Sequence, residues 1–68
     1  MRDYRQYIGR EVSVMTPDGT VQGTLDRVGH HSLTIKPTKL FHTDGSSEQA
    51  PGGLLIIDRW AITLVQVR

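Results

Sequence analysis

The sequence predicts a small, mostly β protein: a five-stranded, strongly bent antiparallel barrel with a short α-helix at its N-terminus. Three observations predict this fold. Apolar and polar residues alternate in several short segments, which is the period of a half-buried β-strand. Glycine, proline and aspartate separate these segments as turns. The chain has only 68 residues and no cysteine, so we expect one domain, spanning residues 1–68, without disulfides.

The N-terminal segment has the spacing of a short helix. Tyr4 and Ile8 are four positions apart, so residues 1–8 can form two helical turns with both side chains on one face. Gly9 follows where a C-cap glycine is expected. A helix this short must pack on the rest of the domain to be stable.

Two strands are expected next. Alternation begins at Val12, and the Thr-Pro-Asp-Gly turn at 16–19 leads into a strand over 21–28. Gly23 removes a side chain at a position where such a strand would curl over itself. The alternation breaks before Val28, which predicts a β-bulge between Leu25 and this residue.

The middle of the chain predicts one more strand and a long connection. A turn at 29–32 precedes a short strand over 33–35, which Pro37 ends. Residues 37–53 are rich in glycine, serine, proline and aspartate and predict a long, variable loop. For the Leu-Phe pair at 40–41 two alternatives remain open: it packs on the body of the domain, or it extends the flanking strands into a longer hairpin.

The C-terminal part predicts the last two strands. Residues 54–57 are apolar at every position, and residues 62–67 carry apolar side chains on both faces. We expect these strands to be covered on both sides. The Asp-Arg-Trp segment at 58–60 separates them. Five short, bent strands in so few residues are typical of SH3-like or OB-like barrels.

Composition excludes several classes of protein. No apolar run approaches the roughly 20 residues that a membrane helix needs, and the N-terminal residues have no apolar core of a signal peptide. We therefore expect a cytoplasmic protein with no membrane partner. The net charge is only +1, whereas nucleic-acid-binding proteins usually carry a larger basic charge, so the charge alone does not indicate this function.

No pattern for catalysis or for a cofactor is present. There is no cysteine nucleophile, no serine in a nucleophile-elbow pattern and no glycine-rich phosphate loop. The acidic residues are scattered singly, and three histidines do not make a convincing structural metal site. We expect no catalytic residues, no metal and no cofactor, and hence no enzyme.

Several short stretches resemble the Sm/Lsm family, including its bacterial branch, Hfq. Residues 7–14 resemble the family's entry from helix into first strand. The Asp18-Gly19 turn, Gly23-Thr24-Leu25 and Val28 resemble its first sequence motif. The segment Arg59-Trp60-Ala61-Ile62-Thr63 resembles the Lys-His-Ala-Ile-Ser segment of Hfq.

The resemblance implies a site and an assembly. In the family, the turn between the second and third strands and the turn between the fourth and fifth build an RNA-binding rim. Here these turns carry His30, His31, Arg59 and Trp60. The resemblance therefore implies a homo-oligomeric ring, a hexamer or heptamer, that binds single-stranded and U-rich RNA at these residues.

Simpler roles remain open for the same residues. His30 and His31 are equally well explained as a solvated turn pair. Trp60 can seal the end of the barrel or a subunit interface instead of stacking on a base. Arg59 can form a surface ion pair with Asp58 or Asp26, which contributes little to stability.

The two C-terminal strands also predict self-association. A small barrel covers one face of such strands, so the second face invites another copy of the chain. The expected oligomer interface comprises Leu54, Ile56, Ile62, Leu64 and Val65. The opposing hypothesis is a monomer in which the N-terminal helix covers this face. A further alternative is an oligomeric scaffold without RNA binding, favoured because Gly29 stands where the family usually has aspartate.

Overall fold

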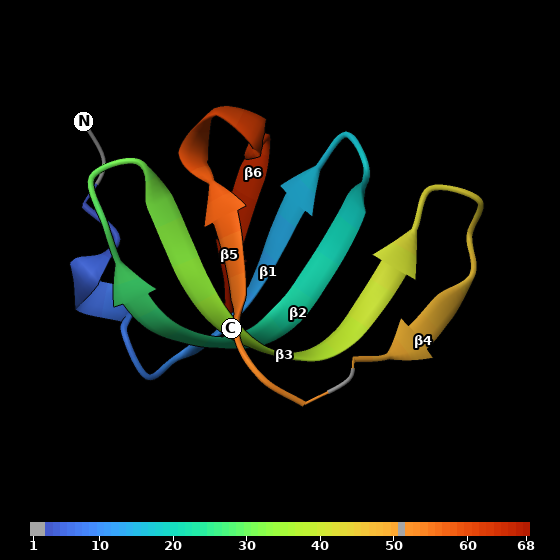
Figure 1. The fold of residues 1–68 in the computed structure, drawn as a ribbon, viewed down its shortest axis with the longest axis horizontal. Helices are drawn as coiled ribbons and strands as arrows, with labels where there is room; N and C mark the ends of the chain where they lie inside the picture. The colour runs from blue at the N-terminus through green and yellow to red at the C-terminus, as the bar shows by residue number, and fades with distance from the viewer. Residues whose placement is uncertain (1–2, 51) are drawn as a thin grey trace.

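The chain forms a single antiparallel sheet of six strands with very little helix (Figure 1). The computed structural model describes residues 3–50 and 52–68. The elements, in chain order, are the 3-10 turn η1 (Arg5–Tyr7), β1 (Glu11–Thr16), β2 (Gly19–Val28), β3 (Ser32–His42), β4 (Ser47–Gln49), β5 (Leu55–Asp58), the 3-10 turn η2 (Arg59–Ala61) and β6 (Leu64–Val67). The mostly β prediction is confirmed.

The predicted N-terminal α-helix is wrong, because the described part of this segment forms only the 3-10 turn η1; residues 1–2 lie outside the described residues. Tyr4 and Tyr7 both pack against the core. Their spacing of three suits a 3-10 turn, in which residues i and i+3 lie on one face. Ile8, predicted to share a buried face with Tyr4, is 47% exposed.

The hydrophobic core is formed by side chains from β1, β2, β3 and β5. Each of its members is at most 8% exposed: Val12, Val14, Leu25, Leu33, Ile35 and Ile57. Those on β1, β2 and β3 follow the predicted alternation. The prediction that residues 54–57 are covered on both sides is wrong for the single chain, because only Ile57 of them is buried. Pairing in register holds the core residues together, since Leu25 faces Ile35 and Leu33 faces Ile57. Burial of these aliphatic side chains is the main source of stability available to such a small sheet.

Gly23 allows β2 and β3 to bend sharply around this core. It is buried, and a Cβ at this position would meet the carbonyl oxygen of Lys36 and lie 2.8 Å from the Cα of Pro37. The pairing of β2 with β3 shifts register between Gln22 and Gly23 and again between Leu25 and Arg27. The second shift confirms the predicted bulge.

Strand β3 does not end at Pro37 as predicted but continues to His42. Pro37 pairs with Gly23 beside a register shift. On the other edge of β3 it lies between the residues that pair with β5 and those that pair with β4. Proline is tolerated at bulges and edges of this kind. Of the two alternatives for residues 40–41, the structure shows the longer hairpin, and β4 is the extra strand; Pro51, within the predicted loop, lies outside the described residues.

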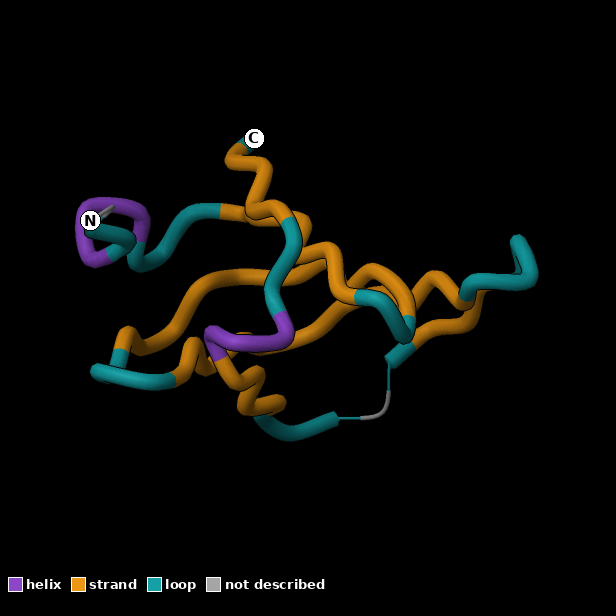
Figure 2. Tube along the Cα trace, turned by 90° about the horizontal axis from the view of Figure 1, so that it is seen from above, coloured by secondary structure: helices purple, strands orange, loops and turns teal. Residues whose placement is uncertain are grey.

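The sheet is open rather than closed into a five-stranded barrel. Its strand order is β4-β3-β2-β1-β6, and β5 pairs with β3. Within residues 3–50 and 52–68, β5 and β6 do not pair with each other. Figures 1 and 2 show η1 and the turn between β2 and β3 at one end of the molecule, and the β3–β4 hairpin at the other. No helix in these described ranges is long and apolar enough to cross a membrane.

Gly23→Ala tests whether the bend depends on this close backbone contact. We expect it to lower the free energy of unfolding by about 2 kcal/mol, because the new methyl group meets backbone atoms that cannot move aside. Urea denaturation at one fixed protein concentration measures this change. Gly52→Ala is the control, since a Cβ there meets nothing within 4 Å. Equal stability of the two variants would contradict the role of Gly23.

Candidate binding site

The candidate site forms where two turns, distant in the sequence, are joined by β3 and β5. Ser32 of β3 pairs with Asp58 of β5. Backbone hydrogen bonds continue beyond this pair, into the turn before Ser32 and into η2 after Asp58. The Arg59 N–H donates to the His31 carbonyl oxygen at 2.8 Å, and the Gly29 N–H donates to the Ser32 carbonyl oxygen at 2.8 Å. The histidine pair and the Arg-Trp pair are therefore held side by side by backbone hydrogen bonds.

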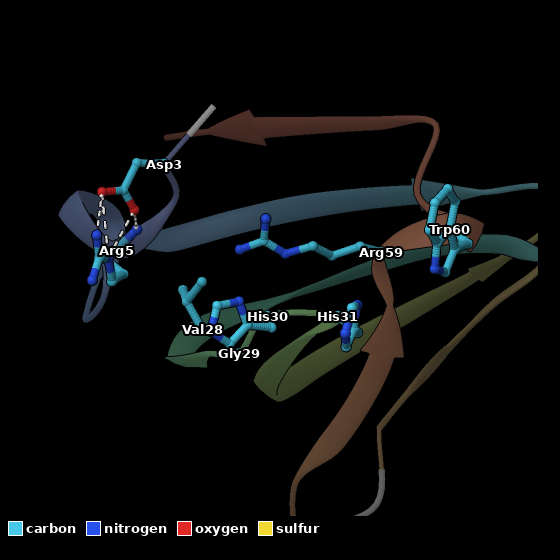
Figure 3. Close-up of a pocket in the computed structure, with 8 residues that line it drawn as sticks. All are labelled: Asp3, Arg5, Val28, Gly29, His30, His31, Arg59 and Trp60. Carbon is cyan, nitrogen blue, oxygen red and sulfur yellow. Dashed lines mark hydrogen bonds and ion pairs between the residues drawn. The ribbon is translucent and has the colours of Figure 1, made fainter. Parts of the chain in front are cut away.

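A cavity of about 730 Å³ lies between these turns and the N-terminal turn. Figure 3 shows the side chains around it. It is lined by Asp3, Arg5, Val28, Gly29, His30, His31, Arg59 and Trp60. All four residues predicted from the sequence thus lie around one cavity. Asp3 and Arg5 were not among the predicted site residues, because nothing in the local pattern indicates that the N-terminal turn reaches this end of the sheet.

Trp60 is presented to solvent rather than packed. Its side chain is 87% exposed, so the alternative in which it seals the end of a barrel is wrong for the single chain. Asp58 fixes the backbone beneath it, because its Oδ1 accepts a hydrogen bond from the Trp60 N–H at 3.0 Å. This is an N-cap at the start of η2. The indole is therefore available as a stacking surface.

Arg59 is the only cation of the pocket that is free of a carboxylate partner in the described ranges. Neither Asp58 nor Asp26 forms the ion pair considered from the sequence. The Arg59 Cζ instead lies 5.4 Å from the centre of the Tyr4 ring. Figure 3 shows the side chain extending across the pocket from η2 toward the N-terminal turn. An unpaired guanidinium in a cavity is a good partner for a phosphate or another anion.

The second arginine of the pocket, Arg5, forms an ion pair with Asp3. Arg5 Nη2 lies 3.1 Å from Asp3 Oδ2, and its Nε lies 3.1 Å from Oδ1. The Arg5 backbone N–H also donates to Oδ1 at 2.9 Å. These hydrogen bonds to the Arg5 side chain and backbone, with a smaller contribution from the charge of Arg59, lower the pKa of Asp3 below its ordinary value of 3.8. Asp3 is therefore ionised at neutral pH and held by its neighbour.

The two histidines are exposed and adjacent. Their ring centres lie 6.2 Å apart with the ring planes tilted by 44°. Both line the pocket. They lie in the turn between β2 and β3, outside the strands, where neighbouring side chains need not point to opposite faces. No group of three or more potential metal ligands occurs among the described residues. The rings thus offer stacking surfaces and hydrogen-bonding nitrogens rather than a metal site.

The residues predicted for an oligomer interface divide into two groups. Leu54, Ile56 and Leu64 are 61%, 69% and 46% exposed, respectively. Ile62 and Val65 are half-buried and pack against the core. The opposing hypothesis, in which the N-terminal segment covers this face, does not hold for Ile56 among the described residues, because Ile56 stays exposed.

Comparison with known proteins places the chain in no family. No family model, curated protein or solved structure matches it. What the pocket can bind is therefore inferred from its own residues and geometry.

The pKa of Asp3 is the quantity that tests the arrangement of the N-terminal turn. We expect Arg5→Ala to raise this pKa toward 3.8, the ordinary value, because the hydrogen bonds to the guanidinium are lost. Because the pKa of Asp3 is lower in the folded state than in the unfolded state, its ionised form stabilises the fold at pH values above the unfolded pKa. This stabilisation is lost as the pH falls through the folded pKa. Carboxyl chemical shifts followed by NMR during an acid titration measure it.

Asp44 provides the control within the same spectrum. Hydrogen bonds from Ser46 lower its pKa, and this residue lies in the β3–β4 turn, away from Arg5. Its titration should not change in the Arg5→Ala variant. An unchanged Asp3 titration beside an unchanged Asp44 titration would show that the Asp3–Arg5 pair does not persist in solution.

Proposed function

We propose that this chain is an Sm-like protein that binds single-stranded RNA in the pocket between its two turns and acts as a homo-oligomeric ring. The observation that carries the proposal is the convergence of His30, His31, Arg59 and Trp60 around one cavity. The sequence resemblance to the Sm/Lsm family singled out the same four residues. Their backbone is fixed by the His31–Arg59 hydrogen bond.

The chemistry of these side chains suits unpaired nucleotides. Bases of single-stranded RNA stack on histidine, tryptophan and arginine side chains, and the backbone phosphates pair with cations. The pocket supplies three planar rings and one unpaired guanidinium. A cavity with a single free cation has a weak attraction for a polyanion. Repetition of the pocket around a ring would multiply this attraction.

Self-association is supported by the strands that flank the pocket. Strand β5 pairs only with β3, and β6 pairs only with β1, among the described residues. Each therefore has a free edge, and exposed Ile56 and Leu64 lie on these two strands. Free edges with exposed apolar side chains favour pairing with another chain. A head-to-tail contact between two different edges closes into a ring when the rotation allows it; the family resemblance suggests six or seven copies.

Arg59→Ala tests the RNA-binding part of the proposal. We expect the affinity for a short oligouridine to fall by about tenfold, because a charge-assisted contact to phosphate is lost. The slope of log affinity against log salt should also decrease by about one. Fluorescence anisotropy at several salt concentrations measures both quantities. Arg27→Ala is the matched control, since Arg27 is exposed on β2 and does not line the cavity. Equal losses in the two variants would rule out a specific role for Arg59.

Ile56→Asp tests the assembly. We expect light scattering after size exclusion to show six or seven subunits for the natural chain and a 7.6 kDa monomer for the variant, because a charge is placed on a 69% exposed apolar side chain. The stability of the monomer should change by only a few tenths of a kcal/mol, as for other surface substitutions. Ser47→Asp, on exposed β4, should leave the mass unchanged. A natural chain that elutes as a monomer would overturn the ring.

The scaffold alternative is favoured by one observation: Leu54, Ile56 and Leu64 are exposed apolar residues, and their burial against another chain needs no RNA. If oligouridine leaves the mass of the ring and the anisotropy unchanged, the chain is an assembly module rather than an RNA-binding protein.

A further inference from the structure

The ring of Tyr4 supports the Arg59 side chain in the pocket. Arg59 Cζ lies 5.4 Å from the centre of this ring, which is within the range of about 6 Å for a cation–π contact. Tyr4 is half-buried and packs against the core. Its backbone is also fixed, because the Tyr4 carbonyl oxygen accepts a hydrogen bond from the Tyr7 N–H at 2.9 Å. The aromatic surface that Arg59 contacts is therefore part of the rigid structure.

Among the described residues, no hydrogen bond or ion pair holds the Arg59 side chain. The Arg59 Nε is buried and donates to no acceptor among residues 3–50 and 52–68. The nearest carboxylate of the pocket, that of Asp3, is bound by Arg5 at 3.1 Å. The Tyr4 ring is therefore the contact recorded for the guanidinium where the Arg59 side chain extends across the pocket (Figure 3).

We propose that Tyr4 is a positioning residue that holds the Arg59 guanidinium ready to bind a phosphate group of RNA; this inference rests on the proposed function of the pocket. The guanidinium carbon lies 5.4 Å from the ring centre, and no hydrogen bond or ion pair among the described residues uses the side-chain N–H groups. A phosphate then meets donors in a fixed fork. An arginine held in this way loses less conformational freedom on binding than one that is free in solvent.

The test compares Tyr4→Phe with Tyr4→Leu. Phenylalanine keeps the aromatic face, whereas leucine keeps an apolar side chain and removes that face. We expect Tyr4→Leu to weaken oligouridine binding about three- to fivefold, the size of a cation–π contact, and Tyr4→Phe to bind as the natural chain does. Tyr7→Leu is the matched control, because Tyr7 is also half-buried and packs on the core in η1. It should not change the affinity.

A double substitution separates positioning from a purely structural role. In the Arg59→Ala background, Tyr4→Leu should cause no further loss of affinity, because the residue that Tyr4 positions is gone. If Tyr4→Leu weakens binding equally in both backgrounds, Tyr4 only stabilises the fold, and the proposal is overturned. The proposal is also overturned if Tyr4→Leu binds as the natural chain does while Arg59→Ala does not.

A measurement without RNA tests the contact itself. The side-chain protons of Arg59 should show upfield ring-current shifts in NMR spectra of the natural chain and of Tyr4→Phe. These shifts should disappear in Tyr4→Leu. Their absence from the natural chain would overturn the proposal even if Tyr4→Leu failed to fold. If the shifts are present but Arg59→Ala leaves RNA affinity unchanged, the RNA function of the pocket fails, and with it the positioning role.

Discussion

The close approach of Gly23 to the backbone of β3 is the constraint on which the rest of the structure depends. A Cβ at residue 23 would collide with the Lys36 carbonyl oxygen, so only glycine lets the two strands bend together at this point. The bend wraps β2 and β3 around a core of six aliphatic side chains. It also divides the outer edge of β3, which pairs with β5 before Pro37 and with β4 after it.

The position of the candidate site follows from this division. Because β5 pairs with the first residues of β3, the end of β5 reaches the turn that begins β3. The hydrogen bond from the Arg59 N–H to the His31 carbonyl oxygen continues the same ladder. Side chains from two turns thus meet at one end of the sheet on rigid backbone. A binding site placed on the ends of paired strands is held more firmly than one on a free loop.

The charges of the pocket are arranged so that one arginine remains unpaired. Asp3 and Arg5 form an ion pair with each other, while the Arg59 guanidinium makes a cation–π contact with the Tyr4 ring. A chain with a net charge of only +1 can still attract an anion when a cation without an ion-pair partner among the described residues lies in a cavity. The exposed indole of Trp60 and the two imidazoles add aromatic surface beside it. This combination of an unpaired cation and planar groups is what the proposed RNA site requires.

Much of the fold could be predicted from local patterns. Alternation identified the core positions of β1, β2 and the first part of β3, and its interruption identified the bulge before Val28. Local patterns failed for the N-terminal turn. Ile8 lies four positions after Tyr4 and Tyr7 lies three positions after it, so the sequence permits either an α-helix or a 3-10 turn. Packing of both tyrosines on the core selected the turn.

The sequence by itself determined which side chains of β1, β2 and the first part of β3 face the core, and which turns carry aromatic and basic residues, because these properties depend on neighbours along the chain. Only the tertiary structure decided that β3 continues past Pro37, that Trp60 is exposed and that Tyr4 contacts Arg59. These features depend on which strand edges meet after the bend at Gly23. Tyr4 and Arg59 lie near opposite ends of the chain, and no periodicity links residues that only the folded sheet brings together.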